Sequence, residues 1–262
     1  MNQNLCKLCL QLKELRESHI LSEYEYKPLY DDKHRFYRLS SKKIKPGILQ
    51  KGLRERLLCN ECERLRSECE RYVSLVMNGG IKLGYEPFSG GVKVTNIDYN
   101  KFKLHQLFLL WIASVSSLPE FSSIKLHHDI EEQLRLKLLS KDPGHPNEYA
   151  CIVCALISNN KGPIRQIILP PSPIEKEGAQ WARFVIGGLV WTYCISINLP
   201  NDIPDDLFIC RKGELNVYFI RPSDVNFLIE TLVRILEPSL KSYPTRNEAE
   251  LRKFVEIDLW EK

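Results

Sequence analysis

The sequence predicts an α+β fold in two parts: a small zinc-binding domain at the N-terminus and a larger mixed α/β domain with antiparallel strands and flanking helices. Two Cys-x-x-Cys pairs in the first quarter of the chain, Cys6/Cys9 and Cys59/Cys62, predict the first part. Short β-rich runs separated by Gly and Pro, with helical patterns on both sides, predict the second. Because 44% of the 262 residues are apolar, disordered and fibrous classes are excluded.

We place the zinc domain at residues 1–80. Its clearest element is a helix of roughly six turns, because apolar residues recur there at three- and four-residue steps. An Asn-Gly-Gly sequence directly after it is suited to end a helix. The segments predicted in and after this domain are strands at 18–24 and 35–39, the helix at 53–77 and a glycine-punctuated linker at 81–91.

The larger domain is assigned to residues 92–262. Its first helix is so apolar that we expect it at the centre of the core. The pair Gly187-Gly188 predicts a tight turn between two strands of an antiparallel or mixed sheet. The predicted elements are a strand at 91–97, helices at 100–117 and 124–140, strands at 149–157, 164–169, 184–186, 189–197, 207–210 and 215–220, and helices at 224–236 and 246–258.

The distribution of charge and the expected lack of targeting segments limit the partners and the compartment that we expect for this protein. Residues 1–75 hold 16 Lys and Arg against 11 Asp and Glu, a net +5, whereas the whole chain is only +4. This asymmetry favours a polyanion partner for the N-terminal domain, with a solvated basic face as the alternative. We expect no membrane anchor and no secretory signal, and therefore a cytoplasmic protein with reduced cysteines.

The cysteine pairs are the strongest chemical signal. Each of the two pairs can present two thiolates to one tetrahedral ion, and four such ligands make a closed structural zinc site. The 49-residue insert between the pairs must carry structure of its own. The alternative is four unrelated cysteines, two of them on a helix face. A third pair, Cys151/Cys154, lies in an apolar run and is interpreted as buried core instead.

A Cys-x-x-Cys knuckle, a hairpin and a helix that begins with a second Cys-x-x-Cys form the layout of a treble clef. In addition, Glu17-Ser18-His19-Ile20 follows the first pair by about ten residues. With these motifs the N-terminal 75 residues resemble the HNH endonucleases, in the four-cysteine zinc version of the ββα-metal fold. The chain differs from that family's pattern at Ser18, Ser22 and Arg54.

The resemblance implies roles for particular residues. His19 would be the general base, and Glu63, directly after the last zinc cysteine, would bind a catalytic Mg²⁺ or Mn²⁺. Glu17 would add a ligand, and Arg64 or Arg66 would clamp the phosphate. The residues alone leave two alternatives open: His19 as a structural strand histidine, and Glu63 as a helix carboxylate that pairs with Arg66.

Basic and aromatic residues alternate in the insert between the two cysteine pairs. The combination suits a nucleic-acid backbone and base stacking, with DNA favoured over RNA, although the aromatic residues serve equally well as the core of a small domain. His34, in the same insert, is a weaker ligand candidate because it lies in a polar turn. The candidate nucleic-acid contacts are Arg35, Arg38, Lys42, Lys43 and Lys45.

The function expected from the sequence is therefore metal-dependent hydrolysis of phosphodiester bonds by an HNH-type endonuclease. The resemblance implies a bacterial or phage setting, with anti-phage defence as a common role. The C-terminal domain would serve target recognition, a protein partner or homo-oligomerisation. The alternatives are a catalytically inactive zinc-stabilised binding module, and an N-terminal module that is accessory to an activity of the larger domain.

Overall fold

The computed structural model describes residues 4–38, 47–158, 162–176, 178–196, 199–200 and 203–222. The predicted C-terminal helices at 224–236 and 246–258 lie outside these residues. The helices are α1 (Glu23–Tyr26), α2 (Asn60–Met77), α3 (Tyr99–Val115) and α4 (His128–Ser140), with short 3₁₀ turns at Lys27–Leu29, Pro119–Phe121 and Asp205–Leu207. The strands are β1 (Asn4–Leu5), β2 (Leu12–Lys13), β3 (Leu15–His19), β4 (Arg35–Arg38), β5 (Gly47–Gln50), β6 (Arg54–Cys59), β7 (Gly84–Phe88), β8 (Gly91–Thr95), β9 (Cys151–Ser158), β10 (Gly162–Pro163), β11 (Leu169–Lys176), β12 (Ala179–Ile186), β13 (Leu189–Cys194) and β14 (Leu215–Ile220).

The second half of the described chain is built on one mixed sheet with the strand order β11-β12-β13-β9-β14-β8-β7, and β10 pairs with β9. Strand β14 runs parallel to β9 and antiparallel to β8, and the other pairs along this order are antiparallel. The predicted turn between β12 and β13 is confirmed, because both Gly187 and Gly188 adopt positive φ. A two-residue hairpin turn of this twist requires that conformation.

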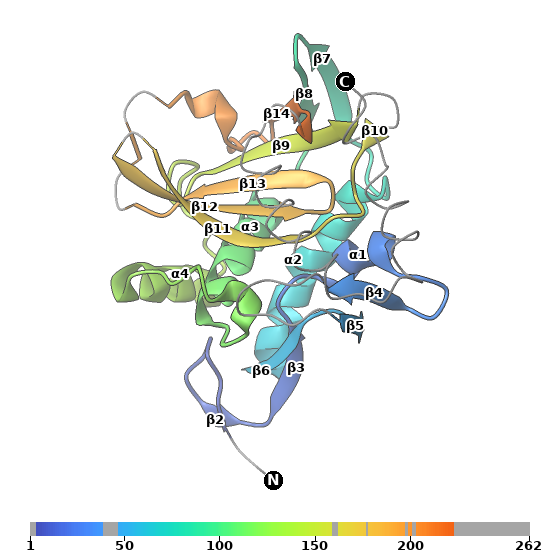
Figure 1. Cartoon of the computed structure of the whole chain (residues 1–262). Helices are drawn as coiled ribbons and strands as arrows, with labels where there is room; N and C mark the ends of the chain where they lie inside the picture. Colours follow the sequence, from blue (N-terminus) through green and yellow to red (C-terminus); the bar gives the residue numbers. More distant parts are fainter. Residues whose placement is uncertain are drawn as a thin grey trace.

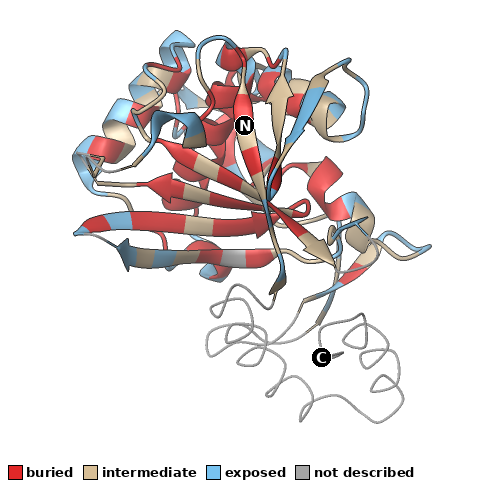
Figure 2. Ribbon diagram, turned by 90° about the horizontal axis from the view of Figure 1, so that it is seen from above, coloured by how far each residue is buried: buried red, intermediate tan, exposed pale blue. Residues whose placement is uncertain are grey.

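Helix α3 lies against this sheet, with α2 and α4 beside it (Figure 1). Asp98 caps its N-terminus, since the carboxylate accepts a hydrogen bond from the Lys101 amide. Phe102 of α3 stacks on Trp191 of β13. Nearly every residue of α3 is buried, and buried residues concentrate in the sheet and the helices behind it (Figure 2). The central apolar helix is therefore confirmed, although its length is Tyr99–Val115.

The N-terminal third consists of three two-stranded sheets and two helices. Strand β1 pairs with β2, β3 with β6, and β4 with β5, all antiparallel. Helix α2 begins directly after β6, with Cys59 as its N-cap residue. This places one cysteine pair in the β1–β2 turn and the other at the junction of β6 and α2.

The predicted linker at 81–91 contains a strand. Residues Gly84–Phe88 form β7 and pair with β8 at the edge of the large sheet. Side chains from both sides of this segment share one buried cluster, which extends from Cys6 to Val217. Glu55 of β6 also accepts hydrogen bonds from Ser116 and Ser117 at the end of α3. The division into two domains thus stays a prediction, while the packing between the two parts is continuous.

The helix predicted at 53–77 is wrong in its first seven residues, which belong to β6 and its approach. A short apolar run such as Leu57-Leu58 fits a buried strand as well as a helix. Pairing of β6 with β3 decides between them, because it satisfies the backbone groups of both strands. The predicted helix at 124–140 is likewise shorter and begins at His128.

The strand predicted at 18–24 is also displaced. Strand β3 ends at His19, and α1 begins at Glu23. Ser22 and Glu25 form a capping box in which each side chain serves the other residue's backbone amide. This motif, Ser-x-x-Glu, is present in the sequence and signals a helix start at the place where we predicted a strand.

Edge strands and a turn account for the other differences. The predicted strand at 164–169 is wrong, since β11 begins only at Leu169, and β7 was missed. Both strands contain proline and lie at opposite edges of the sheet, where a missing N–H is tolerated. The predicted strand at 207–210 is wrong, because these residues end a 3₁₀ turn and continue as a loop. Strand β14 pairs with β8 and β9.

Candidate metal centre and the surroundings of His19

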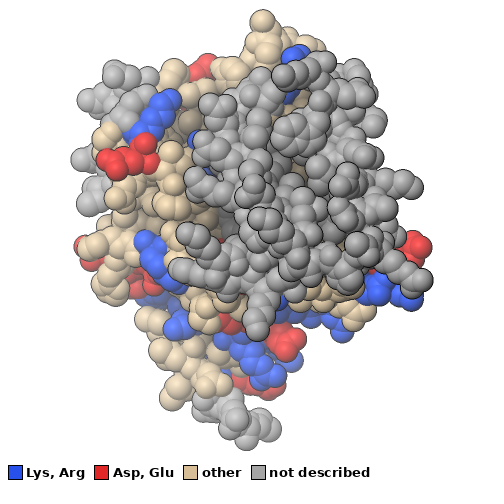
Figure 3. All heavy atoms as spheres, viewed as in Figure 1, with Lys and Arg blue, Asp and Glu red and all other residues tan. Residues whose placement is uncertain are grey.

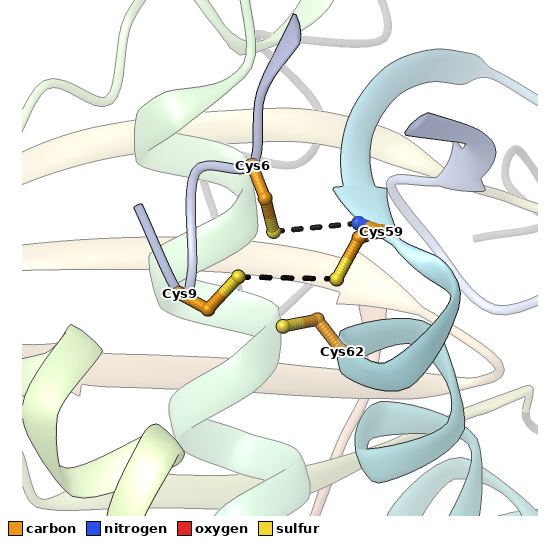
Figure 4. A group of neighbouring side chains, drawn as sticks. All are labelled: Cys6, Cys9, Cys59 and Cys62. Atoms are coloured by element: carbon orange, nitrogen blue, oxygen red, sulfur yellow. Dashed lines mark hydrogen bonds between the residues drawn. The ribbon is translucent and has the colours of Figure 1, made fainter. Parts of the chain in front are cut away.

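The four predicted cysteines converge. One sulfur from each of Cys6, Cys9, Cys59 and Cys62 lies within 4.8 Å of all the others. The sulfurs point toward one another from the β1–β2 turn and the β6–α2 junction, and those of Cys9 and Cys59 are 3.9 Å apart (Figure 4). Zn–S bonds of about 2.3 Å in a tetrahedron place sulfurs about 3.8 Å apart. The four cysteines are therefore positioned to hold a metal ion, and four sulfur donors suit zinc.

The protein environment already favours negative charge at one of these sulfurs. A hydrogen bond from the Cys62 side chain is the main cause that lowers the pKa of Cys6 to about 4, and the Cys59 amide also donates to the Cys6 sulfur at 3.3 Å. The same shared proton raises the pKa of Cys62, and burial raises that of Cys59 to about 11. These shifts favour the thiolate form at Cys6, and a divalent cation would supply the charge that lets the other sulfurs ionise.

The β1–β2 turn is held from two sides. In the turn the Leu10 amide donates to the Cys6 carbonyl at 2.9 Å, and Leu10 has a positive φ of 57°. The Lys7 amide donates to the Leu57 carbonyl of β6 at 2.9 Å. From α4, the Arg135 guanidinium donates to the Leu8 carbonyl at 2.7 Å. The first cysteine pair is thus fixed both by its neighbouring strand and by a helix 127 residues away in sequence.

Other cysteine and histidine clusters do not form such a site. Within the described ranges, the four cysteines are the only group of three or more Cys, His, Asp or Glu residues close enough to share an ion. Cys151 and Cys154 lie three residues apart on β9, so their side chains face opposite sides of the sheet. His128 is the exposed first residue of α4.

His19 ends β3, opposite Arg54 of β6. Its Nε2 atom lies 2.7 Å from a carboxylate oxygen of Glu23 and 2.9 Å from the Nε atom of Arg54. Burial is the main cause that lowers the pKa of the imidazole, and the positive charge of Arg54 adds to it. His19 is therefore uncharged near neutral pH, with 23% of its side chain exposed.

Below His19 lies a buried polar cluster formed by Ser22, Glu25, Arg66 and Glu70. Arg66 donates to the carbonyls of His19 and Ile20 and pairs with Glu70 at 2.6 Å. The Ser22 hydroxyl donates to the same Glu70 oxygen, Oε1, at 2.7 Å. Only 4% of the Arg66 side chain is exposed, so the guanidinium supports the end of β3 from inside, and its predicted role as a phosphate clamp stays a prediction.

Glu25 is the second carboxyl group of this cluster. Burial and the negative charge of Glu70 raise its pKa from an ordinary 4.5 to about 8. Its carboxyl oxygens accept from the Ser22 amide at 2.8 Å and from the Tyr24 hydroxyl at 3.4 Å. Arg66 therefore pairs with the carboxylate of Glu70, while the raised pKa of Glu25 favours its protonated form near neutral pH.

The predicted metal ligands Glu63 and Glu17 are apart from any described metal cluster. Glu63 lies on the first turn of α2, half-buried, and its Oε1 atom has no hydrogen-bond partner among the described residues. Burial raises its pKa, and neighbouring Arg66 opposes this shift. Glu17 is exposed on β3, opposite Arg56. The roles of Glu63 and Glu17 as metal ligands stay predictions. The buried Oε1 atom of Glu63, which has no partner among the described residues, is suited to such a role.

Two of the basic residues predicted to contact nucleic acid are paired with acids. Two guanidinium nitrogens of Arg35 donate hydrogen bonds to the Asp31 carboxylate. The Arg38 guanidinium forms a salt bridge with Glu120 at 3.1 Å. Lys42, Lys43 and Lys45 lie outside the described residues. On the face shown in Figure 3, described Lys and Arg side chains are interspersed with Asp and Glu. Of the aromatic residues nearby, Tyr26 and Phe36 are buried and in ring contact, whereas Tyr37 is exposed.

Neither of two hollows on the described surface is lined by His19 or Glu63. The larger, of about 740 Å³, lies beside the N-terminus of α4 and is lined by Asp129, Glu148 and Leu199 among others. A smaller groove of about 210 Å³ follows α2 at Glu61 and Arg64. Arg64 is thus the more accessible of the two arginines that we considered on α2.

Sequence reasoning missed Glu23, Glu25 and Glu70, which surround His19 and Arg66. The only local signal was the Ser-x-x-Glu capping box, which sets the turn after His19. Contact between Ser22 and Glu70 spans 48 residues and could not be inferred from spacing.

Comparison with known proteins adds no relative. No protein-family model, no curated protein and no solved structure matches the chain. In the described part of the chain no helix is both long enough and apolar enough to cross a membrane.

Proposed function

We propose that the protein is a zinc-stabilised, metal-dependent endonuclease of HNH type. The observation that carries this proposal is the position of His19: an uncharged, partly exposed imidazole at the end of β3, a strand whose first residue, Leu15, pairs with Cys59, one of the converging cysteines. Three features support a treble clef: the β1–β2 turn that holds the first cysteine pair, the antiparallel pairing of β3 with β6, and helix α2, which begins at the second cysteine pair. This is the frame in which an HNH site would be built.

In this proposal the His19 imidazole takes a proton from a water molecule. The resulting hydroxide attacks the phosphorus of a phosphodiester, the bond to the leaving oxygen breaks, and that oxygen takes a proton from solvent. Glu63 would hold a Mg²⁺ or Mn²⁺ ion, which would hold the scissile phosphate and stabilise the leaving oxygen. Because burial keeps His19 uncharged, it is in the proton-accepting form at neutral pH.

Compartment and partners follow from the same proposal. Four reduced cysteines and a nucleic-acid substrate, with DNA favoured, suit a cytoplasmic enzyme, and defence against phage is one setting for it. The large sheet would recognise a target, a protein partner or a second copy of the chain.

A specific observation favours a second candidate, a zinc-stabilised binding module without cleavage. Arg66, Arg35 and Arg38 are each engaged by a carboxylate, and Arg66 is buried. A module of this kind needs the four cysteines but not an ionisable His19.

The test compares wild type, His19→Ala and a matched control, His128→Ala, which removes an exposed histidine from α4. All three are matched for zinc content and incubated with plasmid, single-stranded DNA and RNA in Mg²⁺, Mn²⁺ or EDTA. Metal-dependent cleavage by wild type and control that His19→Ala lacks would establish the nuclease. Equal binding without cleavage by all three would favour the binding module.

A further inference from the structure

Two paired strand ends hold Arg54 against His19. The two residues are direct cross-strand partners of β6 and β3, which places their Cβ atoms about 5 Å apart on one face of the pair. The backbone beside them is fixed as well, because the Ile20 amide donates to the Leu53 carbonyl at 3.0 Å and the Leu53 amide donates to the Tyr26 hydroxyl at 3.2 Å. The two side chains therefore meet without any movement of the backbone.

The contact between the two side chains is a hydrogen bond from Arg54 to His19. The Arg54 Nε–H group donates to the Nε2 atom of the imidazole at 2.9 Å. A neutral imidazole has one nitrogen that carries a proton and one that accepts, so Nε2 is the accepting nitrogen and Nδ1 carries the proton. Nε2 is also the atom with which a neutral ring takes a proton from water. The guanidinium therefore covers the base.

Glu23 keeps the guanidinium at this position. Its Oε2 atom lies 3.8 Å from the Arg54 Nη2 atom, within ion-pair distance, and its Oε1 atom accepts a hydrogen bond from the Tyr30 hydroxyl at 3.0 Å. Oε2 also lies 2.7 Å from the His19 Nε2 atom, yet it accepts no hydrogen bond within the described part of the chain. This is expected beside a nitrogen that accepts rather than donates.

The hydrogen bond to His19 can be given up at little cost. The same Arg54 Nε atom lies 3.0 Å from the Lys51 carbonyl, so the donor keeps an acceptor when the ring contact is lost. The turn that carries this carbonyl is fixed by positive φ angles at Lys51 and Gly52. Because no donor is left without a partner, the main penalty for breaking a partly buried hydrogen bond does not arise.

Arg54 is also free to bind an anion. Its two terminal nitrogens form no hydrogen bond with the described residues, and 30% of its side chain is exposed. Arg66, in contrast, is 4% exposed and pairs with Glu70 at 2.6 Å. A guanidinium with open terminal nitrogens binds a phosphate through two parallel hydrogen bonds, which are stronger than a bond to a neutral imidazole.

We propose that Arg54 is a substrate-responsive cap: its guanidinium covers the proton-accepting nitrogen of His19 in the free protein, and a phosphodiester that binds the guanidinium draws it away and uncovers the base. The step exchanges hydrogen bonds only, since the Arg54 bond to Nε2 is replaced by bonds to phosphate oxygens and a water molecule takes its place at Nε2. This inference rests on the proposed function for the catalytic meaning of the base. The base then becomes available only when a phosphate is in place.

The test uses the full-length protein with ¹⁵N-labelled histidine at one fixed pH. The ¹⁵N chemical shift of a ring nitrogen reports whether it carries a proton and whether it accepts a hydrogen bond, and the His19 signals are identified by their absence in His19→Ala. The variant is Arg54→Ala, and the matched control is Arg56→Ala, which removes an exposed arginine from the same strand. Each protein is measured alone and with a short single-stranded DNA oligonucleotide, without Mg²⁺ or Mn²⁺ so that nothing is cleaved.

In the free wild type and in Arg56→Ala we expect a protonated Nδ1 and a hydrogen-bonded Nε2. The oligonucleotide should move the Nε2 signal of both proteins toward the position that Arg54→Ala shows from the start. Arg54→Ala should bind the oligonucleotide about tenfold more weakly, because charged hydrogen bonds to phosphate are lost. In plasmid cleavage its KM should rise by a similar factor at unchanged kcat, since its base is already uncovered.

Three results would overturn the inference. They are a free wild-type ring with its proton on Nε2, identical Nε2 signals in wild type and Arg54→Ala, and an Nε2 signal that stays in place when the oligonucleotide saturates wild type. A wild type that binds no oligonucleotide overturns the release by phosphate as well. If Arg54→Ala does not fold, Arg54→Met keeps the aliphatic stem of the side chain and carries the test.

Failure of the cap and failure of the proposed function give different results. If wild type cleaves plasmid while the Nε2 signal stays in place under saturating oligonucleotide, the nuclease stands and the cap is wrong. If wild type cleaves no substrate while the oligonucleotide moves the Nε2 signal, the cap stands and the nuclease is wrong.

Discussion

The N-terminal third holds two polar centres that are stabilised in different ways. At the cysteine centre, four sulfurs within 4.8 Å of one another need a cation before they can all ionise. Around His19, the guanidinium of Arg66 compensates Glu70, and Glu25 is kept protonated by burial. The first centre would be closed by a metal ion, whereas the second is balanced by the protein's own charges. The first should therefore respond to chelators, and the second to pH and to loss of a single charge.

The largest effect is expected at the cysteine centre. Cys62→Ser or removal of the metal by a strong chelator should release zinc and unfold the β1–β2 turn and the start of α2, because metal binding and folding are coupled there. Circular dichroism melts should lose more than 10 °C, and zinc content by elemental analysis should fall to near zero, with Cys210→Ser as the control. Full zinc occupancy in Cys62→Ser would contradict the four-cysteine centre.

Next in size is the loss of one charge beside His19. Arg66→Met should cost about 4 kcal/mol in the free energy of unfolding, because Glu70 is left buried without its partner and two carbonyls lose their donor. The double variant Arg66→Met/Glu70→Met should recover part of this cost. Urea unfolding of wild type and both variants measures it, and equal loss in the single and double variants would argue against the pair.

The pH response of Glu25 should be smaller. Its pKa is raised to about 8 in the folded protein, so its contribution to stability is fully present below about pH 4.5 and is lost as pH rises through 8. Glu25→Gln has no such proton to lose. Between pH 5 and pH 8, the unfolding free energy of wild type should fall relative to Glu25→Gln by about 3 kcal/mol. Parallel urea titrations at the two pH values compare them, and parallel pH profiles would contradict a protonated Glu25.

The smallest effect is expected at Glu55, whose carboxylate links β6 to the end of α3 through hydrogen bonds. Glu55→Gln should destabilise the protein by about 1 kcal/mol, because the hydrogen bonds from Ser116 and Ser117 lose their charged acceptor. Glu86→Gln, an exposed substitution on β7, is the matched control. Differential scanning calorimetry measures the shift, and no difference between the two variants would show that this contact does not contribute.

The comparison also separates what could be predicted from what could not. The cysteine ligands are two short-range pairs whose spacing is visible in the sequence, and their convergence is confirmed. The central apolar helix and the hairpin at Gly187-Gly188 follow from local patterns too. The edge strands β7 and β11 were mispredicted because proline and glycine are typical of loops, and only their place at the edge of a sheet allows them.

By itself the sequence determined the four cysteines that converge, the mixed α/β class and the candidate histidine. Only the tertiary structure decided that residues 54–59 form a strand, that Arg66 is an internal brace and that Glu23 is the group at the His19 ring. The physical reason is the range of the interactions. Ligand spacing and apolar periodicity are encoded within a few residues, whereas charge compensation in a buried cluster depends on which carboxylates the packing of β3, α1 and α2 brings together.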